Sequence, residues 1–355
     1  MTRTVTDAPC ALLDRLPDGF LDCPANRLKD ILPRPTLFDL PGRDPQPLFV
    51  STLLHGNETS GLAAVQETLR RHSARGLNRS LILFIGNVDA AAANVRTLPS
   101  QRDFNRVWRG TAFPDDPLAH MARWIYDYVE KRRAFAAVDI HNNTGFNPHY
   151  SCITRLEPKY VALAQLFSRI VVHFQRPRGT SAAAFAELCP AITVECGKSG
   201  ADAGVAHVVE LLDACLSIAE LPDHAPAPHD IELLRTCAIV KPPAGASFSF
   251  DGTPADFVFR PDIDHLNFSE LGAGASFGAL GDEDARLEVL SGEGFDTQPI
   301  NYFDYAGGQI RLARPAIPAM LTVDPRAVQQ DCLCYLMHRI GMDGLGYSRT
   351  DANAH

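Results

Sequence analysis

Residues 47–88, PLFVSTLLHGNETSGLAAVQETLRRHSARGLNRSLILFIGNV, contain the pattern that decides the fold. Two short apolar runs, 47–55 and 80–88, flank an amphipathic stretch over 58–76. Apolar runs of this length that end in polar or Gly residues predict buried strands, and the stretch between them has the periodicity of a helix. The order strand, helix, strand is typical of an α/β domain.

The same alternation continues to about residue 220. Further strands are predicted over 134–141 (AFAAVDIH), 170–174 (IVVHF) and 191–196 (AITVEC), and further helices over 116–134, 157–170 and 204–221. We therefore predict an α/β fold in which a mainly parallel or mixed sheet is sandwiched by helices.

A second domain is predicted after the segment 221–230, LPDHAPAPHD, which is rich in Pro and Ala and reads as a linker. Short β-like runs separated by Gly, Asp and Pro turns follow it, and QQDCLCYLMHRI at 329–340 has a helical pattern. The sequence thus predicts one domain over 1–220, with its core from about residue 47, and a smaller β-rich domain over 231–355.

Charge and composition exclude several classes of protein. The formal net charge of -9 and the pI of about 5.7 argue against a nucleic-acid or anionic-membrane binder. Residues 1–20 lack the uninterrupted apolar segment of a signal peptide, and no stretch approaches the roughly 20 apolar residues of a membrane span. Nine cysteines at irregular spacing indicate reduced thiols. We therefore expect a cytoplasmic protein that binds neither nucleic acid nor membrane.

Three side chains at predicted strand ends suggest a metal site. His55 and Glu58 follow the first strand, and His141 ends the strand over 134–141. Imidazole and carboxylate groups are good zinc ligands, and a catalytic zinc has three protein ligands and one open position. Taken singly, each residue also fits a plain structural role at a strand or helix end. Together they predict one Zn²⁺ per chain, with Asp139 on the same strand face as His141 to orient a ligand imidazole.

Two more features lie at strand ends. Glu195 ends the strand over 191–196 and could act as a general base, although an ion pair with an Arg is the alternative. Residues 96–106, RTLPSQRDFNR, carry three arginines and one Asn. Such a loop suits binding of anionic oxygen, although a solvated basic loop is the alternative.

In their order along the chain, HGNE at 55–58, Arg96 with RDFNR at 102–106, DIHN at 139–142 and VECG at 194–197 resemble the succinylglutamate desuccinylase/aspartoacylase family, a branch of the zinc carboxypeptidase fold. The resemblance covers about residues 47–220. It implies a zinc-dependent hydrolase that cleaves the amide bond of an N-acyl amino acid or a similar small substrate bearing a carboxylate. The roles it implies are zinc binding by His55, Glu58 and His141, activation of zinc-bound water by Glu195, polarisation of the scissile carbonyl by Arg96, and binding of a substrate carboxylate by Asn105 and Arg106.

The C-terminal region looks like the second domain of this family, which narrows the mouth of the active site and supplies a Tyr to the substrate. Tyr302 and Tyr305 are the candidates here. One departure concerns the Arg that aspartoacylases carry about ten residues before the base. The segment 181–195 has no basic residue, and the nearest are Arg176 and Arg178. This departure argues against N-acetylaspartate as the specific substrate.

Two other functions remain compatible with the motifs. A zinc carboxypeptidase acting on peptides would use the same metal, base and carboxylate-binding residues. A catalytically inactive zinc-binding regulator would be expected to lose the base or the Arg first, and both Glu195 and Arg96 are present. A homo-oligomer is compatible with each of these interpretations.

Overall fold

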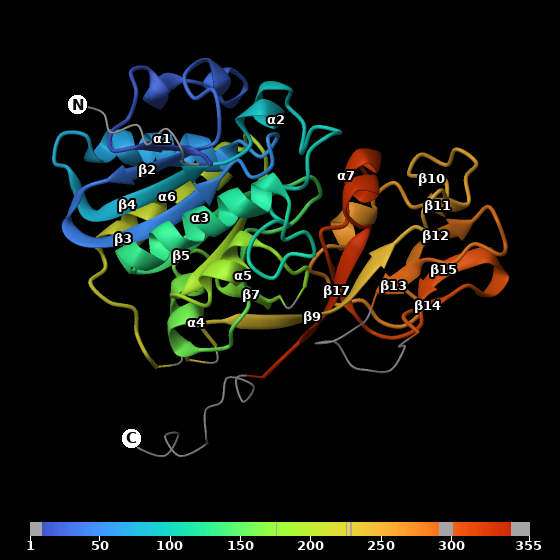
Figure 1. The fold of residues 1–355 in the computed structure, drawn as a ribbon. Helices are drawn as coiled ribbons and strands as arrows, with labels where there is room; N and C mark the ends of the chain where they lie inside the picture. Colours follow the sequence, from blue (N-terminus) through green and yellow to red (C-terminus); the bar gives the residue numbers. More distant parts are fainter. Residues whose placement is uncertain (1–8, 175, 225, 228, 291–300, 342–355) are drawn as a thin grey trace, which may run out of the picture. The chain divides into compact units, whose positions relative to one another are not determined.

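The computed structural model describes residues 9–174, 176–224, 226, 227, 229–290 and 301–341 (Figure 1). The chain divides into two compact units. Unit 1 comprises the residues up to Asn142 together with His149–Glu232, and unit 2 comprises Asn143–Pro148 together with Leu233–Ile340. Within the described part of the chain, no helix is long and apolar enough to cross a membrane.

Unit 1 is built on a mixed sheet. Its strands lie in the order β1 (Ala11–Leu13), β2 (Thr36–Leu40), β4 (Leu77–Ile85), β3 (Gly42–Thr52), β5 (Ala136–Asn143), β8 (Ala191–Lys198), β6 (Tyr150–Ile153) and β7 (Ile170–His173). Strand β3 is parallel to both β4 and β5, whereas β2 is antiparallel to β4 and β6 is antiparallel to β8. The strands predicted over 47–55, 80–88, 134–141, 170–174 and 191–196 are all present, so the α/β prediction is confirmed.

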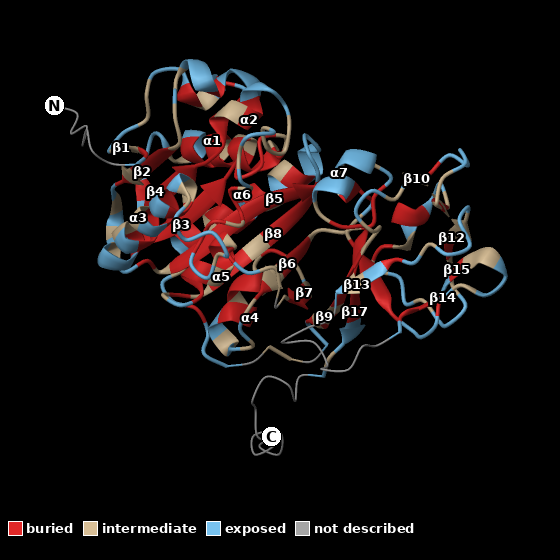
Figure 2. Cartoon of the chain, turned by 45° about the vertical axis from the view of Figure 1, so that its right-hand side comes forward, coloured by how far each residue is buried: buried red, intermediate tan, exposed pale blue. Residues whose placement is uncertain are grey.

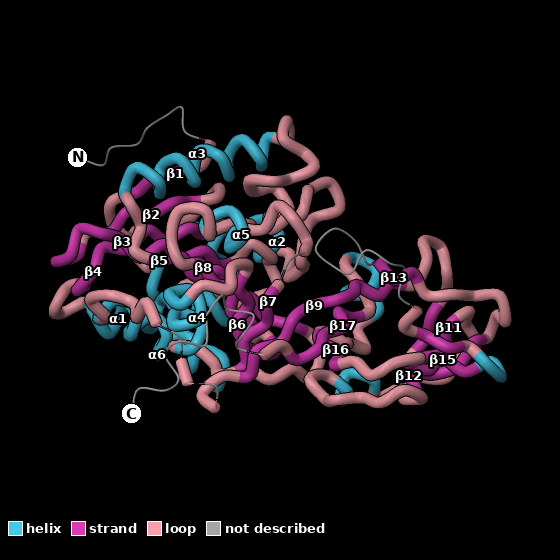
Figure 3. Tube along the Cα trace, turned by 90° about the horizontal axis from the view of Figure 1, so that it is seen from below, coloured by secondary structure: helices cyan, strands magenta, loops and turns pink. Residues whose placement is uncertain are grey.

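Helices cover both faces of this sheet. Figure 3 shows α3 (Pro117–Arg132) and α5 (Ser181–Phe185) on one side, and α1 (Ser60–His72) and α6 (Asp202–Ser217) on the other. The shorter α2 (Val88–Ala92) follows β4, and α4 (Pro158–Gln165) joins β6 to β7. Because both faces are covered, the central strands are buried along most of their length, as Figure 2 shows in red.

An aromatic cluster joins the sheet to the helices on the α3 side. The ring of Phe185 lies 4.2 Å from Phe49 of β3, 5.5 Å from Trp108 and 5.7 Å from Tyr126 of α3. The Trp108 ring is also 5.9 Å from Phe84 of β4. Trp108 is buried, and its backbone N–H donates to the Gly179 carbonyl at 3.0 Å. The loop that contains residues 102–111 is therefore fixed to the sheet close to the strand ends.

Unit 2 is rich in β structure. Strands β9 (Glu232–Lys241), β17 (Cys334–Arg339) and β16 (Ile317–Ala319) pair in this order, with β13 (Glu288–Leu290) on β9. A separate five-stranded sheet contains β10 (Phe248–Ser249), β11 (Phe257–Phe259), β12 (Ser276–Leu280), β15 (Gln309–Leu312) and β14 (Phe303–Asp304). Helix α7 (Pro325–Gln330) lies between β16 and β17 along the chain. A β-rich C-terminal region was predicted, and this is confirmed.

The predicted helix over 329–340 is wrong. Helix α7 ends at Gln330, and Cys334–Arg339 forms β17, antiparallel to β9. The first four residues of β17 are all buried, so the run is apolar on both strand faces. A short continuous apolar run carries no periodicity that separates a buried strand from a buried helix. In unit 1, strands β1, β2 and β6 and helices α2 and α5 are additions to the predicted elements.

Candidate metal centre and active site

The turn after β3 places His55 and Glu58 beside the end of β5. Because β3 and β5 are parallel, their carboxyl ends lie at the same edge of the sheet. The chain leaves β3 through Leu53, whose φ of 54° is unusual for a residue with a side chain. Gly56 then lies so close to α2 that a Cβ on it would be 2.1 Å from the Ala90 carbonyl carbon. Only glycine fits there, and this close approach directs the turn toward His141.

The three predicted ligands converge. Glu58 Oε1 lies 2.7 Å from His55 Nδ1, and Glu58 Oε2 lies 2.7 Å from His141 Nδ1. One ligand atom from each residue lies within 4.8 Å of the other two, and all three side chains are buried. The structure thus brings together two residues of one turn and a third from a strand more than eighty positions away.

A carboxylate lies behind each imidazole. His55 Nε2 is 2.9 Å from Asp103 Oδ1, and His141 Nε2 is 2.9 Å from Asp139 Oδ2. When each Nε2–H donates to its carboxylate, each Nδ1 presents a lone pair toward Glu58. Two imidazole lone pairs and one carboxylate then face the same point, where only a proton or a cation can satisfy them. Two neutral imidazoles backed by carboxylates, with a third carboxylate ligand, form a set of donors that fits zinc.

The charges around this point shift the pKa values of its members. Burial opposes ionisation of Glu58, but His55 and His141 hold the pKa of its carboxyl far below the ordinary value. Burial likewise disfavours a charged His141, but Asp139 and Glu58 raise the pKa of that imidazole well above the ordinary value. The site therefore concentrates negative charge, and it favours a positive species between the ligands.

Asp103 is a site residue that the sequence analysis did not assign. Its Oδ2 accepts from Arg96 Nη2 at 3.1 Å, and its Oδ1, besides facing His55, accepts from the Asn105 backbone N–H at 2.7 Å. Burial would raise the pKa of Asp103, but His55 and Arg96 hold it well below the ordinary value. The only signal in the sequence was an acidic residue within a loop of three arginines.

The ion pair with Asp103 holds Arg96 beside the candidate metal site. Besides its contact with Asp103, its Nη1 is 3.5 Å from Glu58 Oε1, and the Arg96 carbonyl accepts from the Gly56 N–H at 3.1 Å. A guanidinium cation is thus held beside one ligand carboxylate. This position suits stabilisation of negative charge on an oxygen at the centre.

Asn105 belongs to a ring of buried polar groups. Ser51 Oγ donates to Asp139 Oδ1 at 2.6 Å and lies 3.2 Å from Ser181 Oγ. Asn105 Oδ1 accepts from the Ser181 N–H at 2.8 Å, and its Nδ2 is 3.1 Å from His141 Nε2. With the contact between Asp139 and His141, the ring is closed. Because His141 Nε2–H donates to Asp139, the Asn105 NH₂ lies beside this nitrogen without a hydrogen bond to it, and the predicted contact of Asn105 with a substrate carboxylate stays a prediction.

Arg106 and Glu195 lie near this ring. Arg106 Nη1 donates to the Asn105 carbonyl at 2.9 Å. Glu195 is buried on β8, the strand next to β5, and the adjacent Cys196 Sγ donates to the His141 carbonyl at 3.0 Å. The strand that carries the predicted base is thus bonded directly to His141, the third predicted ligand.

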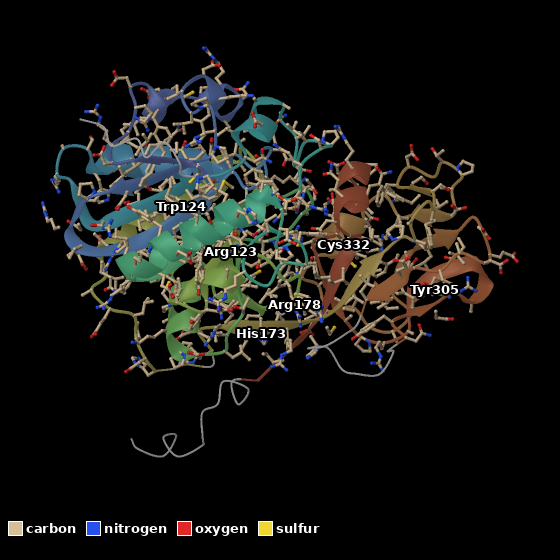
Figure 4. All side chains as sticks on the ribbon, in the orientation of Figure 1. Arg123, Trp124, His173, Arg178, Tyr305 and Cys332 are labelled. Carbon is tan, nitrogen blue, oxygen red and sulfur yellow. The ribbon has the colours of Figure 1, made fainter. Side chains whose placement is uncertain are left out.

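The two candidate tyrosines lie in unit 2. Tyr302 is buried in the hydrophobic core of that unit, and the hydroxyl of Tyr305 accepts from the Leu287 N–H at 3.0 Å. Burial raises the pKa of both phenols. Figure 4 labels Tyr305 among the side chains of this unit. A contact of either tyrosine with substrate stays a prediction.

Comparison with known proteins places this arrangement in a family. Residues 45–217 match the model of the succinylglutamate desuccinylase/aspartoacylase catalytic domain. No curated protein sequence matches the chain.

Three solved structures show the likeness in fold. A succinylglutamate desuccinylase from Chromobacterium violaceum has 18% identity and a TM-score of 0.55, over 83% of this chain and 85% of that one. A succinylglutamate desuccinylase/aspartoacylase from Rhodobacter sphaeroides has 15% identity and a TM-score of 0.54, over 84% and 87%. Murine aminoacylase 3 has 15% identity and a TM-score of 0.50, over 84% and 95–96%. The resemblance seen in the motifs is therefore confirmed, and residues 45–217 are similar to the succinylglutamate desuccinylase/aspartoacylase catalytic domain.

Proposed function

We propose that this protein is a zinc-dependent hydrolase that cleaves the amide bond of an N-acyl amino acid or a similar small substrate bearing a carboxylate. The observation that carries the proposal is the convergence of His55, Glu58 and His141 in a buried site, with an acidic side chain behind each imidazole. The family of the catalytic domain is named for desuccinylase and aspartoacylase activities, which are reactions of this class. One zinc per chain is proposed.

Zinc held by these three residues would supply a Lewis acid for the scissile carbonyl. The residues of the chain prepare the site for it. Asp103 and Asp139 fix the tautomer and the orientation of the two imidazoles, and a partner of this kind also raises the basicity of a ligand. Glu58 contributes the negative charge that offsets part of the charge of the cation.

Glu195 is proposed as the general base. Its carboxylate would take a proton from the attacking water and pass it to the nitrogen of the leaving amine, so that a neutral amine departs. Support comes from the position of Glu195 on β8, next to the strand of His141, and from its burial. The three residues that converge already provide the ligands, so Glu195 is available for proton transfer.

The arginines are proposed to bind the anionic oxygens of the substrate. Arg96, held by Asp103 and close to Glu58, would stabilise the negative charge that develops on the carbonyl oxygen. Arg106, with Asn105, would bind the substrate carboxylate, because a planar guanidinium can donate two parallel hydrogen bonds to it.

A cytoplasmic location is proposed together with this function. The nine cysteines of the chain are all free, which suits a reducing compartment. The proposed partner is a small molecule rather than nucleic acid or a membrane, in keeping with the net charge of -9. A homo-oligomer is compatible with the proposal.

The test is Glu195→Gln in the zinc-loaded protein, assayed on a panel of N-acyl amino acids and short peptides. The substitution keeps the shape of the side chain and removes the basic oxygen. We expect kcat to fall by roughly 10²–10⁴, with little change in KM and one zinc retained. Glu67→Gln is the matched control, because Glu67 is a half-buried residue of α1 that pairs with Arg70 and Arg71.

Two results would contradict the proposal. If wild-type protein with zinc bound hydrolyses none of the panel, the enzyme assignment is wrong and an inactive regulator is the better description. If Glu195→Gln loses its zinc, Glu195 is a ligand and the set of three is incomplete. Peptide cleavage with no activity on N-acyl amino acids would instead identify a carboxypeptidase.

A further inference from the structure

Asn142 follows the ligand His141 at the end of β5, and its side chain lies on the opposite face of the strand. The side chain is buried, and its amide bonds to protein groups at both ends. Oδ1 accepts from the Ser60 N–H at 3.2 Å. Nδ2 lies within donating distance of Ser60 Oγ at 3.0 Å, the Gly197 carbonyl at 2.9 Å and Cys196 Sγ at 3.2 Å.

These partners belong to two other segments of the site. Ser60 is the first residue of α1 and follows the ligand Glu58 by two positions. Cys196 and Gly197 come directly after Glu195, the proposed base. Asn142 thus connects the end of β5, the turn that carries Glu58 and the strand end that carries Glu195.

The same junction is reinforced by neighbouring bonds. The backbone N–H of Asn142 donates to Glu58 Oε2 at 3.2 Å. Ser60 Oγ also accepts from the Gly200 N–H at 3.1 Å, and Cys196 Sγ donates to the His141 carbonyl. The Asn142 amide reaches both α1 and β8, and Ser199, the residue after β8, adds contacts of its Oγ with the Thr59 N–H and Oγ1, both at 3.0 Å.

The chemistry of the partners explains why an amide is present. The Ser60 N–H requires an acceptor, whereas the Gly197 carbonyl requires a donor. An amide provides both, but a carboxylate provides only acceptors and would face a carbonyl oxygen. The partners of the Asn142 side chain are all protein groups on the far side of the strand from His141. Asn142 therefore acts through other residues.

We propose that Asn142 is a positioning residue. It fixes the end of β8, which carries Glu195, relative to the ligands His141 and Glu58. This proposal rests on the function proposed above, because it assumes that Glu195 transfers protons. An asparagine directly after the third ligand would then be required for the geometry of proton transfer, in addition to its contribution to folding.

The test compares Asn142→Asp and Asn142→Ala with wild type, all loaded with zinc. Asp keeps the acceptor for Ser60 and loses the donor to Gly197, whereas Ala loses both. We expect kcat to fall by roughly 10- to 100-fold in both variants, with KM changed less than about threefold, because the loss lies in the reacting geometry and not in ground-state binding. Zinc affinity, measured by competition with a chelator, should stay within about threefold of wild type in the Asp variant.

A local structural measurement accompanies the kinetics. Hydrogen exchange of the peptide covering residues 195–200 should become several-fold faster in both variants, while peptides from α3 exchange as in wild type. Gln66→Glu is the matched control, because its buried amide donates to the carbonyls of Phe20 and Cys23. It places a carboxylate against carbonyl oxygens away from the site, and it should leave kcat and exchange at 195–200 unchanged.

The outcomes separate the two proposals. If kcat and exchange at 195–200 match wild type in Asn142→Ala, Asn142 is not a positioning residue. If the Asn142 variants lose thermal stability and Gln66→Glu, at a similar loss of stability, shows the same fall in kcat, the role of Asn142 is merely structural and the inference is wrong. If wild type hydrolyses nothing, the proposed function fails, and the exchange result alone then decides whether Asn142 fixes the end of β8.

Discussion

Asp103 offers the sharpest prediction, because one carboxylate contacts both His55, a proposed zinc ligand, and Arg96, the arginine proposed to stabilise the oxyanion. Its Oδ1 lies 2.9 Å from His55 Nε2, and its Oδ2 lies 3.1 Å from Arg96 Nη2. In Asp103→Asn, one of these oxygens becomes an NH₂ group. Whichever way the amide turns, a donor then faces either the His55 N–H or the Arg96 guanidinium.

The size of the effect follows from the contact that is lost. Replacing a carboxylate behind a ligand histidine typically lowers metal affinity by about 10- to 100-fold, or about 1.4–2.7 kcal/mol. The negative charge that offsets Arg96 disappears as well, so the arginine is no longer held beside Glu58. We therefore expect kcat to fall together with zinc affinity.

The assay is a competition for zinc against a chelator of known affinity, followed by steady-state kinetics at saturating zinc. Asp116→Asn is the matched control. Asp116 pairs with Arg102 at 3.3 Å and caps α3 by accepting from the Leu118 N–H, a role that Asn also performs well. Zinc affinity of Asp103→Asn within about twofold of wild type would refute the role of the carboxylate behind His55.

Three further predictions follow. Replacing His141 with Ala should abolish stoichiometric zinc binding, as measured by metal analysis, and a variant with full metal content would contradict the ligand assignment. Arg106→Lys should lose on the order of 2 kcal/mol or more of transition-state stabilisation, because an ammonium cannot form the two-pronged contact with a carboxylate. Equal hydrolysis of a substrate and its carboxamide analogue would contradict the role of Arg106 in binding a carboxylate. Burial and the neighbouring His207 lower the pKa of His149 in the folded protein. Below about pH 6.5 the unfolded chain therefore binds a proton at His149 more readily than the folded protein does, and the free energy of unfolding decreases as the pH falls. The thermal midpoint of wild type should therefore drop more than that of His149→Gln between about pH 7.5 and 5.5, and equal drops would show that His149 is not responsible.

Much of the fold was predictable because the strands of unit 1 are short, apolar and bounded by polar residues. Strands β3, β4, β5, β7 and β8 were predicted from this pattern and are present in the structure. The pattern failed at β17, where Cys334–Met337 is buried on both faces and has no strand periodicity.

The candidate site was predictable where residue type and position at a strand end coincide. His55, Glu58 and His141 were identified in this way, and the structure brings them together. Asp103 was not, because its partner His55 lies 48 positions away and the contact depends on how the arginine loop folds back. The contact between Asp139 and His141 could be predicted from the sequence, because residues two apart on a strand share a face.

The closed ring of Ser51, Asp139, His141, Asn105 and Ser181 has a consequence for how the ion is acquired. Every hydrogen bond in the ring joins two protein groups, and Asp139 accepts the Nε2–H of His141, so this imidazole is oriented by folding itself. The conformational entropy of aligning this ligand is then lost when the chain folds and not when the ion arrives. The proposed zinc ion would then be able to leave and return while the chain stays folded. A sample stripped by a chelator should accordingly regain its zinc without passing through the unfolded state.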